Sequence, residues 1–422
     1  MQDRYNNKCS TSSAQALELY LEAVHALLIA QHGAIDLLQA CIAEDPEFGL
    51  AHAALAHTYS MMSKRDDAKS SLEIAIACSI NANERERSHI NIISALINNN
   101  VVHAFDAAIA HLKTYPKDAI IAQAVSGAFG LIGFSGRVGR EQENLLFMEQ
   151  LAPHYGDDSW FNGQYAFAIS EAGDPERAQY MAEFALELEP ESADAIHTLA
   201  HIYYETDKAE SGLAMLEKWR SKYHRDGILH GHIAWHCALW NLELGEFERA
   251  LQILETDIHP NVNHSPAINM VTDFVGFLIR AELMGHSVDS EHWSTASKVI
   301  KQLFPDLGLS FVDAHAAIAL AKNGESENLS RYSAQHLGFA NDQVSSVARA
   351  FQAYIDADWS SVTSYLSPIL FTHERLGGSR AQRDLLEAVN AHSLIRLNRS
   401  DEVISGKMKR RQRINNKIFG LT

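Results

Sequence analysis

Apolar residues recur at three- and four-residue steps along nearly the whole chain, beginning with residues 14–43. This spacing is typical of amphipathic helices, whereas the alternating pattern of strands is hard to find. Short polar or Gly/Pro-containing breaks at 44–46, 115–118, 172–175 and 376–379 separate the helical segments, and no long linker divides them. The pattern predicts an all-α protein built from helix–turn–helix units in series.

Small residues repeat where the two helices of a hairpin would cross. In three successive units, spaced by 34 and then 38 residues, they are Ala166 and Ala178, Ala200 and Gly212, and Ala238 and Ala250. This is the tetratricopeptide pattern, whose hairpins stack into a right-handed superhelical solenoid with the first helices lining the concave face. We therefore expect one tetratricopeptide-like repeat domain over residues 14–405, with its clearest repeats at 160–257. A disordered or loosely attached N-terminus (1–13) would precede it, and a basic C-terminal tail (406–422) would follow.

The charge balance narrows the class of partner. Lys and Arg number 35 against 53 Asp and Glu, a net charge of −18, which argues against nucleic acid and anionic membranes as partners. No apolar run approaches the roughly 18 residues of a membrane span. The four cysteines lie far apart in sequence and form no CxxC pair, which favours a reducing, cytoplasmic location.

Two histidine pairs are the clearest candidates for chemistry. His197 and His201 form one i,i+4 pair, and His232 and His236 form another in the next repeat. This spacing puts both members of a pair on one helix face, and in the repeat frame that face borders the groove. Neighbouring first helices pack roughly 8–10 Å apart, so the four imidazoles can converge. Because the chain has 22 histidines, hydrogen-bonded core histidines are the competing interpretation.

A convergent histidine cluster suits two kinds of chemistry. As metal ligands the four histidines would fit Zn, Cu, Ni or Fe, and axial ligation of haem is also conceivable. As acid/base groups they would act near neutral pH. Residue 198 is Thr, so the glutamate of an HExxH metalloprotease is absent.

Several further residues are candidates for the same groove. Asp313 and His315 would form an orienting pair, and Arg383 follows a glycine turn that resembles an anion-binding helix start. Asp273 begins an apolar helix and is a candidate for binding a substrate. For these residues, helix capping, helix-end charge and structural ion pairs are the simpler interpretations.

Aromatic side chains could supply a wall for a bound ligand. Trp160 and Tyr165 lie on the first helix that precedes the histidine pairs, with Phe167 beside them, and Trp235 stands between the histidines of the second pair. Aromatic residues at helical spacing more often belong to a core.

Six segments, taken in order along the chain, resemble the tetratricopeptide repeat protein 38 family. They are RERSH (85–89), IHTLAHI (196–202), HIAWH (232–236), GEFE (245–248), FVDAH (311–315) and LGGSRAQRD (376–384). The resemblance implies one all-helical repeat domain along the full length. It also implies that the matched residues form one pocket: His197, His201, His232, His236, Asp313 and His315. One departure is Ser126, which stands where the family pattern leads us to expect a histidine.

Two functions remain open on this basis. The first is a site in the concave groove that binds a small molecule and carries out metal- or histidine-dependent chemistry on it. The second is a non-catalytic scaffold that binds a peptide or protein in the groove, as concave repeat surfaces commonly do. Closure of the repeats over a buried histidine cluster would favour the first, and an open channel would favour the second. The sequence does not indicate an oligomeric state.

Overall fold

The structure is a computed structural model that describes residues 1–334 and 336–405. Its helices alternate between first and second members of successive hairpins. The first helices are α1 (Ala14–Leu28), α3 (Gly49–Met61), α5 (Glu84–Ile97), α7 (Ala119–Val125), α9 (Ser159–Glu171), α11 (Ala193–Glu205), α13 (His230–Leu244), α15 (Ala267–Leu283), α17 (Ser310–Lys322), α19 (Asn341–Ile355) and α21 (Arg380–Arg396). The second helices are α2 (Ala34–Glu44), α4 (Arg65–Cys78), α6 (Val101–Thr114), α8 (Arg140–Tyr155), α10 (Pro175–Leu188), α12 (Ala209–Arg220), α14 (Phe247–Ile253), α16 (Ser290–Leu303), α18 (Ser326–Ala334), α20 (Trp359–Leu366) and α22 (Ser400–Ser405).

Three short helical segments complete the description. Two are 3₁₀ turns, Ser79–Asn81 and His373–Leu376, and one is a π-helical stretch at Leu254–Ile258 that extends α14. Within the described residues the only β-type pairing is an isolated bridge between Gln2 and Lys8. The all-α prediction is confirmed.

Small residues let the helices of a hairpin, and of neighbouring hairpins, approach closely. Ala166, Ala178 and Ala200 are completely buried at such crossings. A Cβ atom on Gly212 of α12 would lie only 2.4 Å from the ring of Trp240 on α13, so this contact requires glycine. The repeat positions found in the sequence are therefore the packing positions of the fold.

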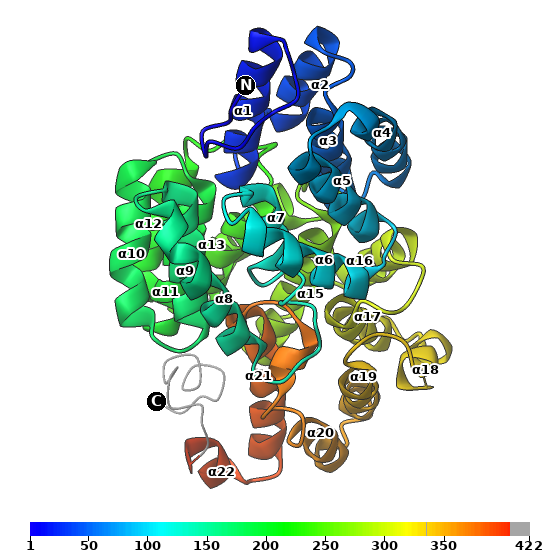
Figure 1. Cartoon of the computed structure of the whole chain (residues 1–422). Coiled ribbons are helices and arrows are strands. Elements are labelled where there is room, and N and C mark those ends of the chain that lie inside the picture. The colour runs from blue at the N-terminus through cyan, green and yellow to red at the C-terminus, as the bar shows by residue number, and fades with distance from the viewer. Residues whose placement is uncertain (335, 406–422) are drawn as a thin grey trace.

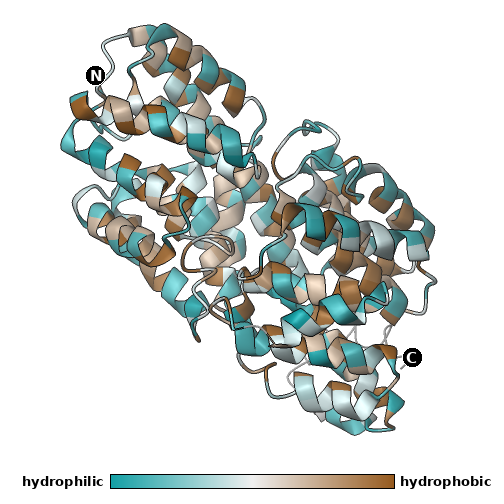
Figure 2. Cartoon of the chain, turned by 90° about the vertical axis from the view of Figure 1, so that its right-hand side faces the viewer, coloured by the Kyte–Doolittle hydropathy of each residue, from teal (hydrophilic) through white to brown (hydrophobic). Residues whose placement is uncertain are grey.

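Successive first helices lie side by side and form a superhelical solenoid (Figure 1). Contacts run from α9 to α11, from α11 to α13, and onward through α15 and α17 to α19. Hydrophobic and hydrophilic residues occur on the same helices, as amphipathic packing requires (Figure 2). The predicted solenoid of tetratricopeptide-like hairpins is confirmed.

Helix α21 returns to the concave side of the solenoid. It packs against α15 and also contacts α11, and in Figure 1 it runs between the repeats around α11 and those around α19. The guanidinium of Arg280 on α15 donates to the carbonyl of Ala381 at 2.7 Å, and Tyr204 on α11 donates to Asp384 at 3.3 Å. The chain's own helix therefore covers part of the groove that sequence analysis left open for a partner.

The loop between α7 and α8, residues 126–139, joins the N-terminal half to this closure. Its Phe129 and Phe134 lie against Phe311 at the start of α17. Arg140, which follows the loop, donates to the backbone carbonyls of Glu374 and Gly378. The segment before α21 is thus held from both halves of the chain.

The N-terminal segment makes specific contacts, in contrast to the loose attachment that we expected. Glu86 accepts the backbone N–H of Ser10 at 2.8 Å, Arg85 donates to the carbonyl of Lys8 at 3.1 Å, and Cys9 is buried. These contacts fasten residues 1–13 to α5. The basic tail predicted at 406–422 lies outside the described residues. Among the helices that the structure does describe, none is both long enough and apolar enough to cross a bilayer.

Candidate functional site: a buried histidine cluster

Helix α11 presents His197 and His201 on the concave side because another of its faces packs into the apolar core. Ser192 caps the start of the helix, and its hydroxyl accepts the N–H of Ala195 at 3.1 Å. Leu199 packs into the apolar core, which leaves His197 and His201 on the concave side. Helix α13 follows the same rule in the next repeat, where the completely buried Ala238 occupies the packing stripe.

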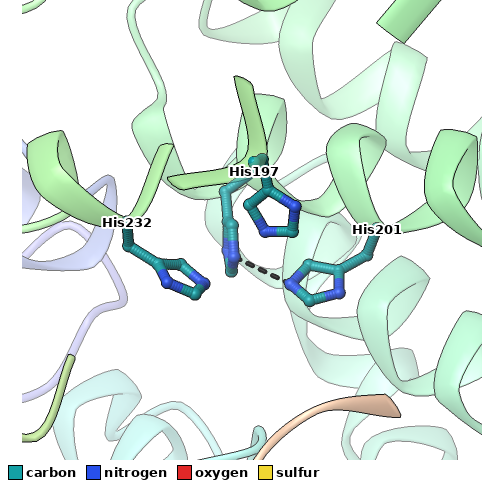
Figure 3. Close-up of side chains that lie close together, drawn as sticks. His197, His201 and His232 are labelled. Atoms are coloured by element: carbon teal, nitrogen blue, oxygen red, sulfur yellow. Dashed lines mark hydrogen bonds between the residues drawn. The ribbon is translucent and has the colours of Figure 1, made fainter. Parts of the chain in front are cut away.

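The four imidazoles from α11 and α13 converge, and Figure 3 labels three of them, His197, His201 and His232. The Nε2 atoms of His197 and His201 are 2.8 Å apart, and the two ring centroids are 4.5 Å apart. Between the helices, His197 lies 4.8 Å from His232, and His201 lies 4.7 Å from His236, measured between ring centroids. One potential ligand nitrogen from each of the four residues lies within 4.8 Å of the others. The predicted grouping of the four histidines is present in the structure.

Burial favours the neutral form of His197, His201 and His236. His201, His232 and His236 are at most 3% exposed, and both ring nitrogens of His236 lack a hydrogen-bond partner. Burial, followed by the neighbouring imidazoles, holds the pKa of His197, His201 and His236 well below the usual value. Unprotonated ring nitrogens are the form that coordinates metal ions.

A carboxylate supports the cluster from its second face. The fully buried Asp273 of α15 lies 2.7 Å from Nδ1 of His232, which leaves Nε2 of that histidine to face the cluster. The other carboxylate oxygen of Asp273 accepts the side-chain amide of Gln382 at 3.3 Å. Asp273, which sequence analysis named as a candidate for binding a substrate, is therefore a direct partner of His232. It also links the cluster to α21.

Aromatic and cationic groups surround the imidazoles. Trp235 stacks on His232 with ring centroids 5.3 Å apart, and Phe167 of α9 meets His201 edge-on at 5.1 Å. Arg280 lies over the Trp235 ring at 5.6 Å, and burial lowers its pKa to about 10 against the opposing pull of Asp384 and Asp273. Sequence reasoning missed Arg280, although one arginine in the otherwise apolar stretch 274–281 was a usable signal.

The predicted pairing of Asp313 with His315 is not what orients this histidine. Nδ1 of His315 bonds to the backbone carbonyl of Phe311 at 2.8 Å, while the Asp313 carboxylate accepts the N–H of Gly308 at 2.8 Å. Residues two apart on a helix point to nearly opposite sides, so the two groups diverge. Burial lowers the pKa of His315 to about 4. Asp313 instead accepts a hydrogen bond from the turn ahead of α17. This role resembles helix capping, which sequence analysis gave as the simpler interpretation.

Arg383, expected to hold an anionic substrate group, is engaged within the protein. Its guanidinium donates to Glu141 of α8 and to the carbonyl of Gly378. At the start of α21, the backbone N–H of Arg380 donates to the carboxylate of Glu171 at 2.9 Å. The anion at this helix start is thus a carboxylate from α9, and burial raises its pKa to about 7.

Two of the predicted aromatic residues lie elsewhere. Trp160 packs with Tyr155 and Phe161 in the N-terminal apolar core. The hydroxyl of Tyr165 accepts a hydrogen bond from Arg177 of α10 at 3.0 Å. Of the aromatic residues on α9, Phe167 is the one in ring contact with the histidines.

The motif at 85–89 belongs to a separate polar cluster. Asp118 accepts a hydrogen bond from Arg85 at 2.7 Å and lies 3.0 Å from Nδ1 of His89 and 3.1 Å from Nε2 of His111. Burial alone would raise the pKa of this carboxyl, but the two histidines and Arg85 hold it well below its usual value. These groups fasten α5 and α6 to the start of α7. Ser126, the departure from the family pattern, is buried with its hydroxyl unpartnered.

Hairpin geometry and sequence together define a TPR-type protein. Residues 170–235 match the tetratricopeptide repeat family model, a range that includes three of the four histidines. Among solved structures, the chain is similar at 13% identity and TM-score 0.25 to a chain of the Naa15/Naa10 complex bound to HypK-THB. That match covers 96% of this chain and 65% of the other, so the chain spans about two thirds of its length. The TPR domain of P58(IPK) gives 14% identity and a TM-score of 0.21, over 91% of this chain and 98% of that domain.

Proposed function

We propose that this TPR-type protein holds one transition metal ion between His197, His201, His232 and His236 and acts there on a small molecule. The observation that carries the proposal is the convergence of four imidazoles with ligand nitrogens within 4.8 Å of one another. His236 supports it most directly, because burying two ring nitrogens without partners is costly unless something binds them.

The geometry is close to that of a filled site. In a tetrahedral zinc site, metal–nitrogen bonds of about 2.0–2.1 Å separate the nitrogens by roughly 3.3 Å. On metal binding, the distance of 2.8 Å between Nε2 of His197 and Nε2 of His201 would increase slightly. The longest separations between ligand nitrogens, which reach at most 4.8 Å, would decrease. Four imidazoles suit Zn, Cu, Ni or Fe. The rings meet edge to face with centroids 4.5 and 4.7 Å apart, which is too close for the flat macrocycle of haem to fit between them.

The Asp273–His232 pair adds a second support. Metal-binding histidines usually donate their other ring N–H to a carboxylate, which fixes the ring and raises its basicity. To polarise an oxygen of the small molecule or activate water, the metal would take a ligand beyond the four histidines, because four protein ligands alone form a closed site. The chain's own contribution would be a dry, aromatic-walled site covered by α21.

The alternative is a scaffold that binds a peptide or protein in the groove. Two observations weigh against it: α21 already packs against α15 and α11, and three of the four histidines, His201, His232 and His236, are buried. A partner would have to displace α21 to reach the same surface. We also propose a cytoplasmic location, since all four cysteines are unpaired.

Elemental analysis of the purified protein tests the proposal. We expect about one equivalent of a transition metal per chain, and loss of that metal in both His201→Gln and His236→Gln. The matched control is His52→Gln, which changes a buried histidine that contacts the carbonyl of Pro46 far from the cluster. Folding is checked by circular dichroism. Metal-free protein that takes up neither Zn²⁺ nor Co²⁺ would overturn the metal site.

A further inference from the structure

Asp194 is a buried carboxyl one helical turn before His197. It lies on the same face of α11 as the histidine pair, because residues three and four apart on a helix are neighbours. Its Oδ1 accepts the side-chain amide of Gln164 on α9 at 2.7 Å. Its Oδ2 is buried and has no hydrogen-bond partner among the described residues. One oxygen of this carboxyl is therefore held in place while the other is unsatisfied.

Two glycines pack closely against this carboxyl and its partner. Oδ2 of Asp194 faces Gly163, where a Cβ atom would lie 3.2 Å away. Gln164 in turn faces Gly127, whose Cβ would lie 3.3 Å from the amide oxygen. The residue preceding Gly127 is Ser126, which also has a buried, unpartnered hydroxyl. Gln164 thus contacts one unsatisfied side chain, Asp194, and the glycine that follows a second, Ser126.

The opposite end of the same helical stripe is paired with α21. On α11, Glu205 pairs with Arg380 and Tyr204 bonds to Asp384, and on α9, Glu171 accepts the N–H of Arg380. The second carboxylate oxygen of Glu171 is nevertheless buried without a partner among the described residues, as is Oδ2 of Asp194. Asp194 differs from Glu171 in that no cationic side chain of the described residues acts on it, whereas Arg380, Arg383 and Arg140 act on Glu171.

We propose that Asp194 and Gln164 form a subsite that binds a protonated amine on the small molecule whose other end coordinates the metal. This rests on the proposed metal site and names the class of its ligand: a metal-coordinating group with an ammonium a few bonds away. An ammonium satisfies the unpartnered oxygen by a charge-assisted hydrogen bond. Burial raises the pKa of Asp194 to about 7, although the hydrogen bond from Gln164 acts in the opposite direction. The ionised carboxylate is therefore costly to bury, and a cationic partner would stabilise it.

Aminoalkyl hydroxamates test the subsite. Hydroxamates chelate divalent metals, so we would use those of glycine, β-alanine and γ-aminobutyrate, each against its amine-free counterpart. Binding is followed through the visible absorption of Co²⁺-loaded protein. We expect at least one amine to bind about 10- to 100-fold more tightly than its counterpart, the range for a charge-assisted hydrogen bond. Equal affinities within every pair would overturn the subsite while leaving the metal site intact.

Two variants distinguish loss of the amine subsite from loss of the metal site. Asp194→Asn keeps the Gln164 hydrogen bond and should reduce each amine preference to about unity without loss of Co²⁺. Asp257→Asn, which changes a carboxylate paired with Arg220, should keep the preference. The comparison within wild-type protein needs no variant and stands even if Asp194→Asn folds poorly. If Co²⁺ gives no histidine-dependent absorption bands, both the metal site and the subsite fail.

Discussion

Nδ1 of His232 lies 2.7 Å from the carboxylate of Asp273, and both side chains are almost completely buried. The pair joins α13 to α15, and the second oxygen of the same carboxylate reaches Gln382 on α21. A single carboxylate therefore sets the orientation of one proposed metal ligand and holds the helix that covers it.

Replacing this carboxylate should weaken the metal site without removing a ligand. We expect Asp273→Asn to lower metal affinity about 10- to 100-fold, as is usual when a supporting carboxylate is lost. The measurement is competition with a chromophoric chelator. Asp257→Asn serves as the control and should keep wild-type affinity, because Asp257 pairs with Arg220 away from the histidines. An unchanged affinity in Asp273→Asn would argue that His232 is not a ligand.

Arg383 should prove to be a structural residue. Arg383→Ala leaves Glu141 and the carbonyl of Gly378 without this donor, so we expect a loss of about 3–5 kcal/mol in the free energy of unfolding. Urea denaturation measures it. Arg249→Ala, in an exposed pair with Glu217, should cost less than about 1 kcal/mol. A small loss in Arg383→Ala, together with weakened binding of an anionic ligand, would restore the substrate role.

The buried carboxyl of Asp194 should make stability fall with rising pH. Its pKa is about 7 in the fold and about 3.9 in the unfolded chain, so the folded protein holds the proton more tightly. The loss in free energy of unfolding caused by ionising Asp194 is absent below pH 4, grows between pH 4 and 7, and is complete above pH 7.

Asp194→Asn should remove this cost in ligand-free protein. We expect the variant to match wild type at pH 4 and to be more stable at pH 8, by up to about 4 kcal/mol at roughly 1.4 kcal/mol per pKa unit. Thermal unfolding at the two pH values measures it. An equal difference at both pH values would mean that Asp194 titrates normally.

Gly212 should tolerate no side chain. A Cβ atom there would come within 2.4 Å of the Trp240 ring, so Gly212→Ala should cost about 1–3 kcal/mol by overpacking the contact between α12 and α13. Ser211→Ala introduces the same residue at the exposed neighbouring position and should change stability by less than about 0.5 kcal/mol. A stable Gly212→Ala protein would show that the two helices can move apart at little cost.

The fold was readable from sequence because its determinants are local. Apolar spacing at three and four residues and the recurrence of Ala166, Ala200 and Ala238 fix hairpins and their stacking. The histidine grouping was readable for the same reason: i,i+4 spacing sets the helix face, and the repeat sets the neighbouring helix.

The rest of the site depends on contacts that no local pattern encodes. The return of α21 to the groove brings Gln382 to Asp273, residues more than a hundred positions apart. The same closure pairs Arg383 with Glu141, which converted an expected anion site into an internal ion pair. Asp194 escaped notice because an aspartate near a helix start reads as helix-end charge, and only burial distinguishes it.

Because the chain is synthesised from its N-terminus, α21 can cover the groove only after the helices that form the groove have been made. Translation produces α11, α13 and α15 well before α21, and N-terminal segments fold first as the chain emerges. On the proposed function, the four histidines and Asp273 would assemble while the groove still faces water, and an ion would reach them directly during that interval. After Gln382 and Arg280 fasten α21, exchange of the ion would require the helix to undock. Metal bound during synthesis of the chain would then be retained for as long as the chain stays folded.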